Sequence, residues 1–276
     1  MRYEIKTAGE QLAYFIQDRI LSRAAWDKFS AELTCTGRGD VLCDFFHEIT
    51  VVNLTCRIVA AGTSLLRASG ERPARSLQDT SFEKELLDFL REGLSVRQSL
   101  CGDLLRNALR AVGSAQGDAT TKERNTFKAW ADREHRRCYL CGVGLDFSEQ
   151  DAHAKFTLEH IWPQRFGGDS IPDNWLPACG KCNSQRKRDF ATWAMPNVQS
   201  LILGFAPSDR EYTAVDGSQR FALHQLAAKK LAQQRNISLK QAYLILRPWE
   251  SPRLIDADDL GDFFNLAIHR ASLEVS

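Results

Sequence analysis

The chain has 276 residues, of which 43% are hydrophobic and 26% are charged, values that are ordinary for a soluble globular protein. Its formal net charge is +1, so nucleic-acid binding would require a local basic patch rather than the charge of the whole molecule. The most apolar stretch, residues 41–66, is interrupted by charged residues, and the N-terminus has no apolar run. We therefore expect no membrane span, no secretory signal and a cytoplasmic location, where cysteines favour metal ligation over disulfides.

The first 120 residues have the apolar spacing of helices. A long helix is expected within residues 40–67, although the β-branched run at residues 49–52 leaves a strand as the alternative there. Another helix is expected to begin at Thr80, with Glu83 completing a capping box. The segment 113–118 contains Gly and Ser and is typical of a linker.

The chain beyond this linker divides into two further regions. Residues 121–197 are dense in Cys, His, Trp, Gly and Pro and predict a small cysteine-rich module. Residues 198–276 are expected to be helical, with a capping box formed by Ser238 and Gln241. Two helices in this region have helix-turn-helix spacing, which predicts a packed hairpin, with DNA recognition as the alternative. The sequence thus predicts an N-terminal helical domain over residues 1–120, the module, and a C-terminal helical region.

Two Cys-x-x-Cys pairs lie inside the module. Structural zinc takes four ligands in a tetrahedron, and a two-residue gap lets both sulfurs of a pair reach one ion. A segment this small has little core, so bound zinc would supply much of its folding free energy. Ordinary buried cysteines or a redox pair are the alternative, and the four remaining, scattered cysteines are expected to be small core residues. The predicted zinc ligands are Cys138, Cys141, Cys179 and Cys182.

A candidate catalytic centre lies between the two cysteine pairs. The segment 156–163 predicts a short strand that ends at Glu159 and His160, and a helix near the second pair carries Asn183. Phosphodiester hydrolysis requires a base for water, which a neutral imidazole supplies near neutral pH. It also requires a hard cation, and magnesium prefers carboxylate and amide oxygens. Adjacent strand residues point to opposite faces, so the strand must end or bulge at this pair.

The segment that contains these residues resembles the HNH endonucleases, whose core is two strands and a helix around a metal. The family's motif residues correspond to His160, Asn174 and Asn183, and the acid-His-Ile-x-Pro, glycine-rich-loop and Cys-x-x-Cys-Asn patterns also agree. The four cysteines match the zinc-containing branch of the family. Together with the helical spacing of the flanks, the resemblance implies a mainly α protein with a small embedded ββα-metal (HNH) zinc-bound module. It covers residues 137–194 and says nothing about the helical flanks.

The resemblance also implies a role for each motif residue. His160 would be the general base, and Asn174 would brace the following loop and orient His160. Glu159 and Asn183 would hold a catalytic Mg²⁺ or Mn²⁺. Most family members have Asp where this chain has Glu159, and the extra methylene can shift the position or the preference of the metal.

Basic residues surround this centre and offer contacts to the phosphates that flank a scissile bond. A solvated helix face is the alternative explanation for such charges. The predicted nucleic-acid-binding residues are Arg165, Lys181, Arg186, Lys187 and Arg188.

These features together predict a metal-dependent HNH endonuclease that hydrolyses phosphodiester bonds in DNA, with the preference for DNA resting on the family. HNH proteins with long helical flanks resemble bacterial phage-defence or restriction components, so we expect an effector that is gated by a regulatory partner such as an ATPase. The alternative is a catalytically silent, zinc-stapled nucleic-acid-binding or scaffold protein. The retained base and metal ligands argue against that alternative.

Overall fold

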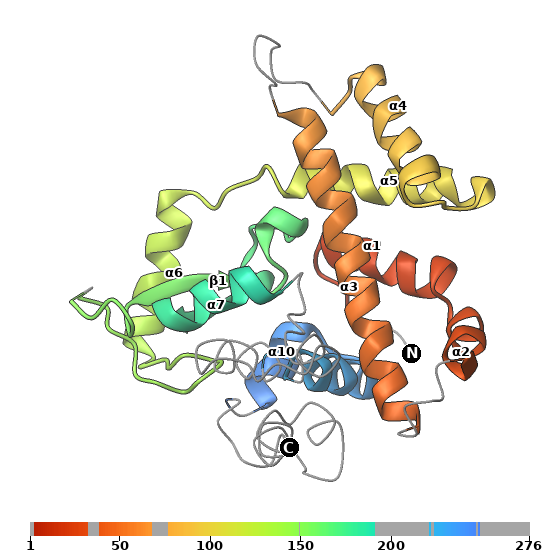
Figure 1. Ribbon diagram of the computed structural model, residues 1–276. Coiled ribbons are helices and arrows are strands. Elements are labelled where there is room, and N and C mark those ends of the chain that lie inside the picture. The colour runs from red at the N-terminus through yellow and green to blue at the C-terminus, as the bar shows by residue number, and fades with distance from the viewer. Residues whose placement is uncertain are drawn as a thin grey trace, which may run out of the picture.

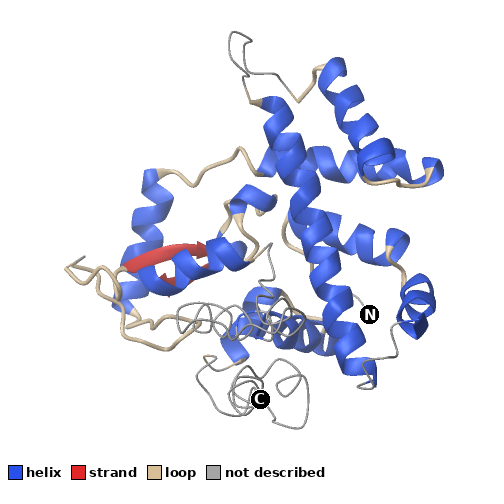
Figure 2. Cartoon of the chain, in the orientation of Figure 1, coloured by secondary structure: helices blue, strands red, loops and turns tan. Residues whose placement is uncertain are grey.

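The computed structural model describes residues 3–32, 39–67, 77–148, 150–190, 221, 224–246 and 248. Figure 1 shows helices α1 to α5 on one side, the small sheet with α6 and α7 on the other, and α10 below. The described chain is helical except for a small two-stranded sheet (Figure 2), which confirms the predicted fold class. The elements are the α-helices α1 (Ala8–Phe15), α2 (Arg23–Glu32), α3 (Gly39–Leu66), α4 (Thr80–Asp88), α5 (Gln98–Ser114), α6 (Thr121–Arg133), α7 (Gly180–Asp189) and α10 (Leu239–Ile245), the π-turns η1 (Ile16–Ile20) and η3 (Phe89–Gly93), the 3-10 turns η4 (Gln164–Phe166) and η5 (Pro172–Asn174), and the strands β1 (Phe156–His160) and β2 (Trp175–Cys179).

Helix α3 forms the spine of the N-terminal layer, and α1, α4 and α5 pack around it. The strand alternative for residues 49–52 is wrong, because that run lies inside α3, where Val51 and Val52 are buried. Branching at Cβ lowers helix propensity only slightly, and the packing of an apolar face outweighs it. Helix α5 contributes the matching face of this core through Leu104 and Ala108.

The segment His47–Leu66 of α3 is long and apolar enough to cross a membrane by length and composition, with a mean hydropathy of 1.5. Within the fold, its side chains Val51, Ile58 and Val59 are fully buried against neighbouring helices. In total, 44% of its most apolar window is buried inside the fold, so the helical core accounts for part of the apolar character of α3.

Among the described residues, three helices have a complete capping box. In each, the side chain of the residue before the helix accepts from the backbone N–H of the third helical residue, whose own side chain accepts from the backbone N–H of the capping residue. One of these boxes, Ser238 with Gln241, confirms the sequence prediction for α10. The box predicted at Thr80 is wrong: Asp79 caps α4 by accepting from the backbone N–H of Ser81 at 2.8 Å. The cap position requires extended backbone, which Asp79 has, whereas Thr80 is already helical. The other two boxes pair Thr7 with Glu10 and Thr120 with Glu123.

Strands β1 and β2 form an antiparallel pair in which Phe156 lies opposite Cys179 and His160 lies opposite Trp175. Helix α7 follows β2 directly, so the chain forms a ββα unit with α7 packed on both strands. Helix α6 packs on β1, and a small aromatic core links them through Phe127, Phe156 and Trp175. The prediction that Trp162 and Trp175 are packing residues is confirmed by their burial, while Trp193 lies outside the described residues.

The hydrophobic core is continuous across the three predicted regions. Buried residues such as Leu12, Trp162 and Tyr243 belong to one cluster, although they come from the N-terminal, central and C-terminal parts of the chain. The ring of Tyr243 on α10 lies edge-on to Tyr139, 5.3 Å between centroids, which packs the C-terminal hairpin against the cysteine-rich module. The division into domains at residues 120 and 197 stays a prediction, and the segment 191–220 lies outside the described residues.

Candidate active site and zinc centre

The two Cys-x-x-Cys pairs converge on one point. The first pair lies in the loop that follows α6, and the second pair spans the end of β2 and the first turn of α7. The four sulfur atoms all lie within 4.8 Å of one another. The separation of Cys141 Sγ and Cys179 Sγ is 3.8 Å, which matches the edge of a tetrahedron with metal–sulfur bonds of about 2.3 Å. The converging residues are Cys138, Cys141, Cys179 and Cys182, and they form a metal site with the ligands and spacing of zinc.

The crowding of four thiols shifts their pKa values in opposite directions. A hydrogen bond from Cys138 lowers the pKa of Cys141 to about 7. Hydrogen bonds from the other three thiols hold the pKa of Cys179 well below its usual range, whereas the same network raises the pKa of Cys182. Thiolates are the form that binds a metal, and a cation among the sulfurs would replace this sharing of protons.

Two of the remaining cysteines have described side chains, and both behave as expected for core residues. Cys56 and Cys101 are buried in the helical layer. Burial raises the pKa of the Cys56 thiol, which keeps it protonated and unreactive. Cys35 and Cys43 fall outside the residues whose side chains the structure describes.

A cavity of about 180 Å³ lies at the end of β1 and is lined by both Glu159 and His160. Two adjacent strand residues reach the same cavity because the β-ladder ends at this pair. The backbone N–H of Ile161 turns to the carbonyl of Asn174 at 2.8 Å, and the chain bends away after it. Glu159 is 3% exposed, whereas His160 is half-buried, so the cavity offers a buried carboxyl group beside an accessible imidazole.

Asn174 lies behind this cavity and ties together the loop that follows His160. Its side-chain oxygen accepts from the backbone N–H of Trp162 at 2.8 Å, and its Nδ2 donates to the carbonyls of Trp162 and Asp169, both at 2.9 Å. Gly168 allows this close packing, since a Cβ there would lie 1.7 Å from the carbonyl oxygen of Trp162. Asn174 thus braces the loop, and it does not line the cavity.

Asn183 lies in the first turn of α7, a helix that contacts both strands. It is 4% exposed, and its side-chain oxygen Oδ1 is buried with no hydrogen-bond partner among the described residues. Leaving an amide oxygen in this state costs about 1–3 kcal/mol, so buried acceptors of this kind suit a cation or a donor from a ligand. Asn183 does not line the cavity of Glu159 and His160, and its partnership with Glu159 at one cation stays a prediction.

The predicted phosphate-binding residues are distributed unevenly around the cavity. Arg165 is exposed, lines the cavity and lies over the ring of Phe166, with 4.4 Å between its Cζ and the ring centroid. Lys181 is exposed on α7 but does not line the cavity. The three basic residues 186–188 lie on α7, and their side chains fall outside the described residues.

Sequence reasoning missed Arg124, which lines the same cavity from α6. Its Nε donates to the carbonyl of Ala119 at 3.1 Å, and its guanidinium pairs with Asp118 at 3.3 Å. These contacts hold a guanidinium group in the lining of the cavity, to which Arg165 also contributes. Nothing local in the sequence distinguishes Arg124 from other helix-surface arginines, because only the packing of α6 on β1 brings it to the site.

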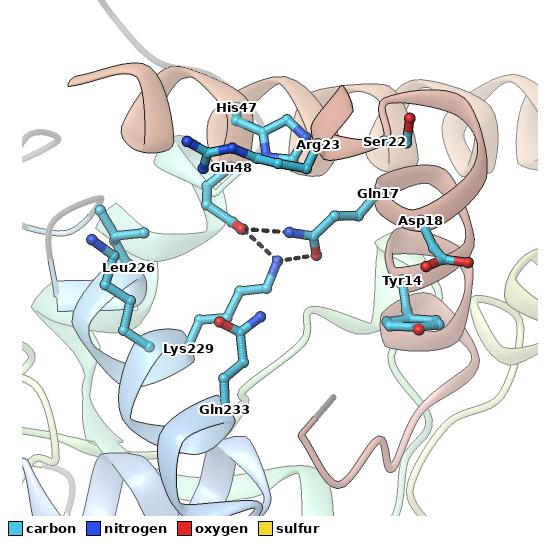
Figure 3. A pocket seen from close by; sticks show the side chains of 11 residues that line it. Tyr14, Gln17, Asp18, Ser22, Arg23, His47, Glu48, Leu226, Lys229 and Gln233 are labelled. Carbon is cyan, nitrogen blue, oxygen red and sulfur yellow. Dashed lines mark hydrogen bonds and ion pairs between the residues drawn. The ribbon is translucent and has the colours of Figure 1, made fainter. Parts of the chain in front are cut away.

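A larger cavity of about 470 Å³ lies among η1, α3 and the helix over residues 224–235. Figure 3 shows Lys229 between Gln17 and Glu48, with which it forms a hydrogen bond of 3.0 Å and an ion pair, and Gln17 donates to Glu48 at 2.9 Å. The three groups satisfy one another, and none of the predicted site residues lines this cavity. The triad therefore joins the C-terminal helix to the N-terminal layer rather than marking a reaction centre.

Comparison with known proteins gives one match. Residues 138–189 match the family model described as HNH endonuclease. A search of curated proteins and a search of solved structures each found no match. The matched residues begin at the first zinc-site cysteine and end with α7, so they span the complete ββα unit and all four sulfur ligands. Residues 138–189 are therefore an HNH endonuclease module with the four-cysteine metal site of the zinc-binding branch of that family.

Proposed function

We propose that this protein is a metal-dependent endonuclease that hydrolyses phosphodiester bonds in DNA. The observation that carries the proposal is a single cavity, at the edge of the HNH module, that is lined by both Glu159 and His160. The HNH match implies a nucleic-acid substrate, and DNA as the particular substrate follows from the resemblance to members of the family.

His160 is the base of the proposed reaction. Its imidazole lines the cavity and is only half-buried, so water and a phosphodiester could reach it. In its neutral form it takes a proton from the attacking water, and the resulting hydroxide bonds to phosphorus as the ester oxygen leaves. The aromatic edge of Trp175 supports the imidazole from behind, with 6.3 Å between ring centroids, so the ring has a defined wall to pack against.

Glu159 and Asn183 are the residues proposed to hold the catalytic Mg²⁺ or Mn²⁺. Their oxygen atoms are the kind of ligand that a hard cation prefers. Glu159 offers a buried carboxyl group at the cavity, and Asn183 offers a buried amide oxygen that has no hydrogen-bond partner among the described residues. A bound divalent cation would supply positive charge to the phosphate and to the departing oxygen.

Arg124 and Arg165 are proposed to bind the phosphates on either side of the scissile bond. Both line the cavity, and they approach it from different elements, α6 and η4. Because the net charge of the chain is only +1, local guanidinium groups of this kind must provide the attraction for the nucleic-acid backbone. Lys181 and the basic residues 186–188 of α7 extend this proposed surface.

We further propose that the protein is a cytoplasmic defence or restriction effector whose cutting is gated by a partner such as an ATPase. The support is indirect: a free nuclease endangers its own cell, and long helical flanks surround a small HNH module. The isolated protein is therefore expected to cut weakly.

The proposal is tested by incubating plasmid DNA with Mg²⁺ or Mn²⁺ and comparing the wild type with His160→Ala and His153→Ala at equal zinc content. His153 is an exposed histidine in the same module that does not line the cavity, so it is a matched control. Equal zinc content shows that a loss of cutting does not come from a misfolded metal site. A single-stranded RNA of the same sequence tests the choice of substrate.

Nicking or linearisation by the wild type and by His153→Ala, with a loss of about 100-fold or more in His160→Ala, is the expected result. Equal cutting by His160→Ala would remove His160 as the base. No cutting by any of the three proteins, with DNA binding retained, would favour the catalytically silent zinc-stapled binding protein or a requirement for the partner.

A further inference from the structure

The proposed base is in contact with a residue that neither the motif nor the family pattern includes. His160 Nε2 lies 3.1 Å from the hydroxyl oxygen of Ser170, and this oxygen lies 3.1 Å from the backbone carbonyl oxygen of Gly117. Gly117 belongs to the segment between α5 and α6, so the chain of contacts runs from the nuclease module into the helical flank.

The positions of the hydrogen atoms in this chain follow from the chemistry of the three groups. A carbonyl oxygen only accepts, and a serine hydroxyl has a single hydrogen to donate. If the serine hydrogen pointed to His160, the oxygens of Ser170 and Gly117 would face each other with no hydrogen between them. The satisfied arrangement has Ser170 donating to Gly117 and accepting a hydrogen from His160 Nε2. Nε2 is therefore the protonated nitrogen of the neutral imidazole, and Nδ1 is the basic one.

We infer that Ser170 is a positioning residue that fixes the tautomer and the orientation of His160, using the carbonyl of Gly117 as its anchor. This inference rests on the proposed function for its catalytic meaning. A general base must present one particular nitrogen to the water, and an imidazole in the wrong tautomer presents a hydrogen there instead.

Ser170 is itself held from two sides. Its neighbour Asp169 has its carbonyl bonded to Asn174, the residue that braces the loop. The carbonyl of Gly117 accepts a second hydrogen bond, of 2.5 Å, from the side chain of Gln164, which also donates to Asp118 at 3.0 Å. The segment between α5 and α6 is thus fastened to the loop at the point where Ser170 needs an acceptor, and this segment forms part of the catalytic centre.

The test is nitrogen-15 NMR of the histidine rings in the full-length, zinc-loaded protein, comparing the wild type with Ser170→Ala and Ser170→Thr. The spectrum of His160→Gln identifies the signal of His160 among the six histidines of the chain. The wild type is expected to show a proton on Nε2 that exchanges slowly with water. Ser170→Ala is expected to lose this slow exchange, and Ser170→Thr, which keeps a hydroxyl, is expected to retain it.

Ser148→Ala provides a matched control, because it removes a serine hydroxyl of the same module that donates to Asp146 and does not line the cavity. In this variant the Nε2 proton of His160 is expected to stay protected. A proton on Nδ1 in the wild type, or equal protection in Ser170→Ala, would overturn the inference. These results need no cutting activity, so they are independent of whether the endonuclease proposal holds.

Where the wild type cuts DNA, Ser170→Ala is expected to lower kcat about tenfold while KM stays within about twofold, since one hydrogen bond is lost and Ser170 makes no proposed contact with substrate. Undiminished kcat in Ser170→Ala would overturn the positioning role even if the NMR signal changed. An NMR response in a protein that does not cut would support the bond to Ser170 and would favour either the catalytically silent protein or a requirement for the partner.

Discussion

The side chain of Asp169 fastens the loop after His160 to the N-terminal helices, and its removal gives a measurable loss of stability. Its Oδ2 accepts from the backbone N–H of Ala8 at the start of α1, at 2.7 Å, and its Oδ1 accepts from the hydroxyl of Ser114 at the end of α5, at 2.6 Å. The backbone N–H of Gly9 also donates to the carbonyl of Gly167 at 2.8 Å. We therefore consider Asp169→Ala, which removes both side-chain contacts and leaves the backbone contact in place.

The expected loss follows from the kind of contacts that Asp169 makes. A hydrogen bond to a charged group contributes about 1.5–3 kcal/mol, and a carboxylate at a helix N-terminus adds about 0.3–1 kcal/mol. Asp169 is half-buried, so solvent weakens both effects, and Asp169→Ala should lower the free energy of unfolding by about 2–4 kcal/mol. Asp169→Asn keeps the shape and loses the charge, and it should cost about half as much.

The assay is urea denaturation of the zinc-loaded protein, with Ser114→Ala and the double variant completing a mutant cycle. Ser114 and Asp169 share a hydrogen bond. The double variant should therefore lose about 1 kcal/mol less unfolding free energy than the sum of the two single variants. Asp173→Ala removes an exposed carboxylate of the same loop and should change stability by less than about 0.5 kcal/mol. A loss in Asp169→Ala no larger than in Asp173→Ala, or full additivity in the cycle, would refute the fastening of the loop by Asp169.

Three further outcomes follow from buried or clustered polar groups. Burial raises the pKa of Glu10 from 4.5 to about 7, so between these values the folded state holds a proton that the unfolded state has released. The free energy of unfolding should fall by up to about 3 kcal/mol as pH rises through that window, and urea titrations should show Glu10→Gln free of this loss. Lys229→Met should destabilise the fold by about 3 kcal/mol, because it removes the ion-pair partner of Glu48 and leaves only the hydrogen bond from Gln17 of the contacts in this triad. Adding Glu48→Leu should restore most of the loss, as thermal melts can show. Cys182→Ala should abolish stoichiometric zinc binding, measured by metal analysis, and should lower the melting temperature of the chain.

The parts of the site that the sequence predicted are those with local patterns. Two Cys-x-x-Cys pairs specify a shared metal without knowledge of the fold, and the four sulfurs do converge. The strand before Glu159 and the helix after Cys179 were also predictable, because apolar alternation and the metal-binding turn define them locally. Adjacent residues of a strand point to opposite faces, so Glu159 and His160 were not expected to share a site within a regular strand. They line one cavity because the β-ladder ends at His160.

The parts that escaped prediction depend on contacts between distant segments. Ala8 and Asp169 lie 161 residues apart, and Gly117 and Ser170 lie 53 apart, so no spacing or propensity reveals either pair. The prediction of the capping residue of α4 was wrong for a local reason. Two adjacent residues, Asp79 and Thr80, were both competent to cap, and the backbone that enters the helix decided between them.

The helical flanks contact the candidate active site directly. Helix α1 and the end of α5 hold the loop through Asp169, and the segment after α5 supplies the carbonyl of Gly117 on which Ser170 depends. The imidazole of His160 is thus connected through Ser170 to the segment between α5 and α6, and Asp169, the residue before Ser170, is hydrogen-bonded to α1 and to the end of α5. The cysteines of the zinc site take no part in these contacts. We therefore expect a displacement of α1 or α5 to alter the position of His160 more than that of the four sulfurs, which would let the flanks control the proposed reaction while a bound metal stabilises the module.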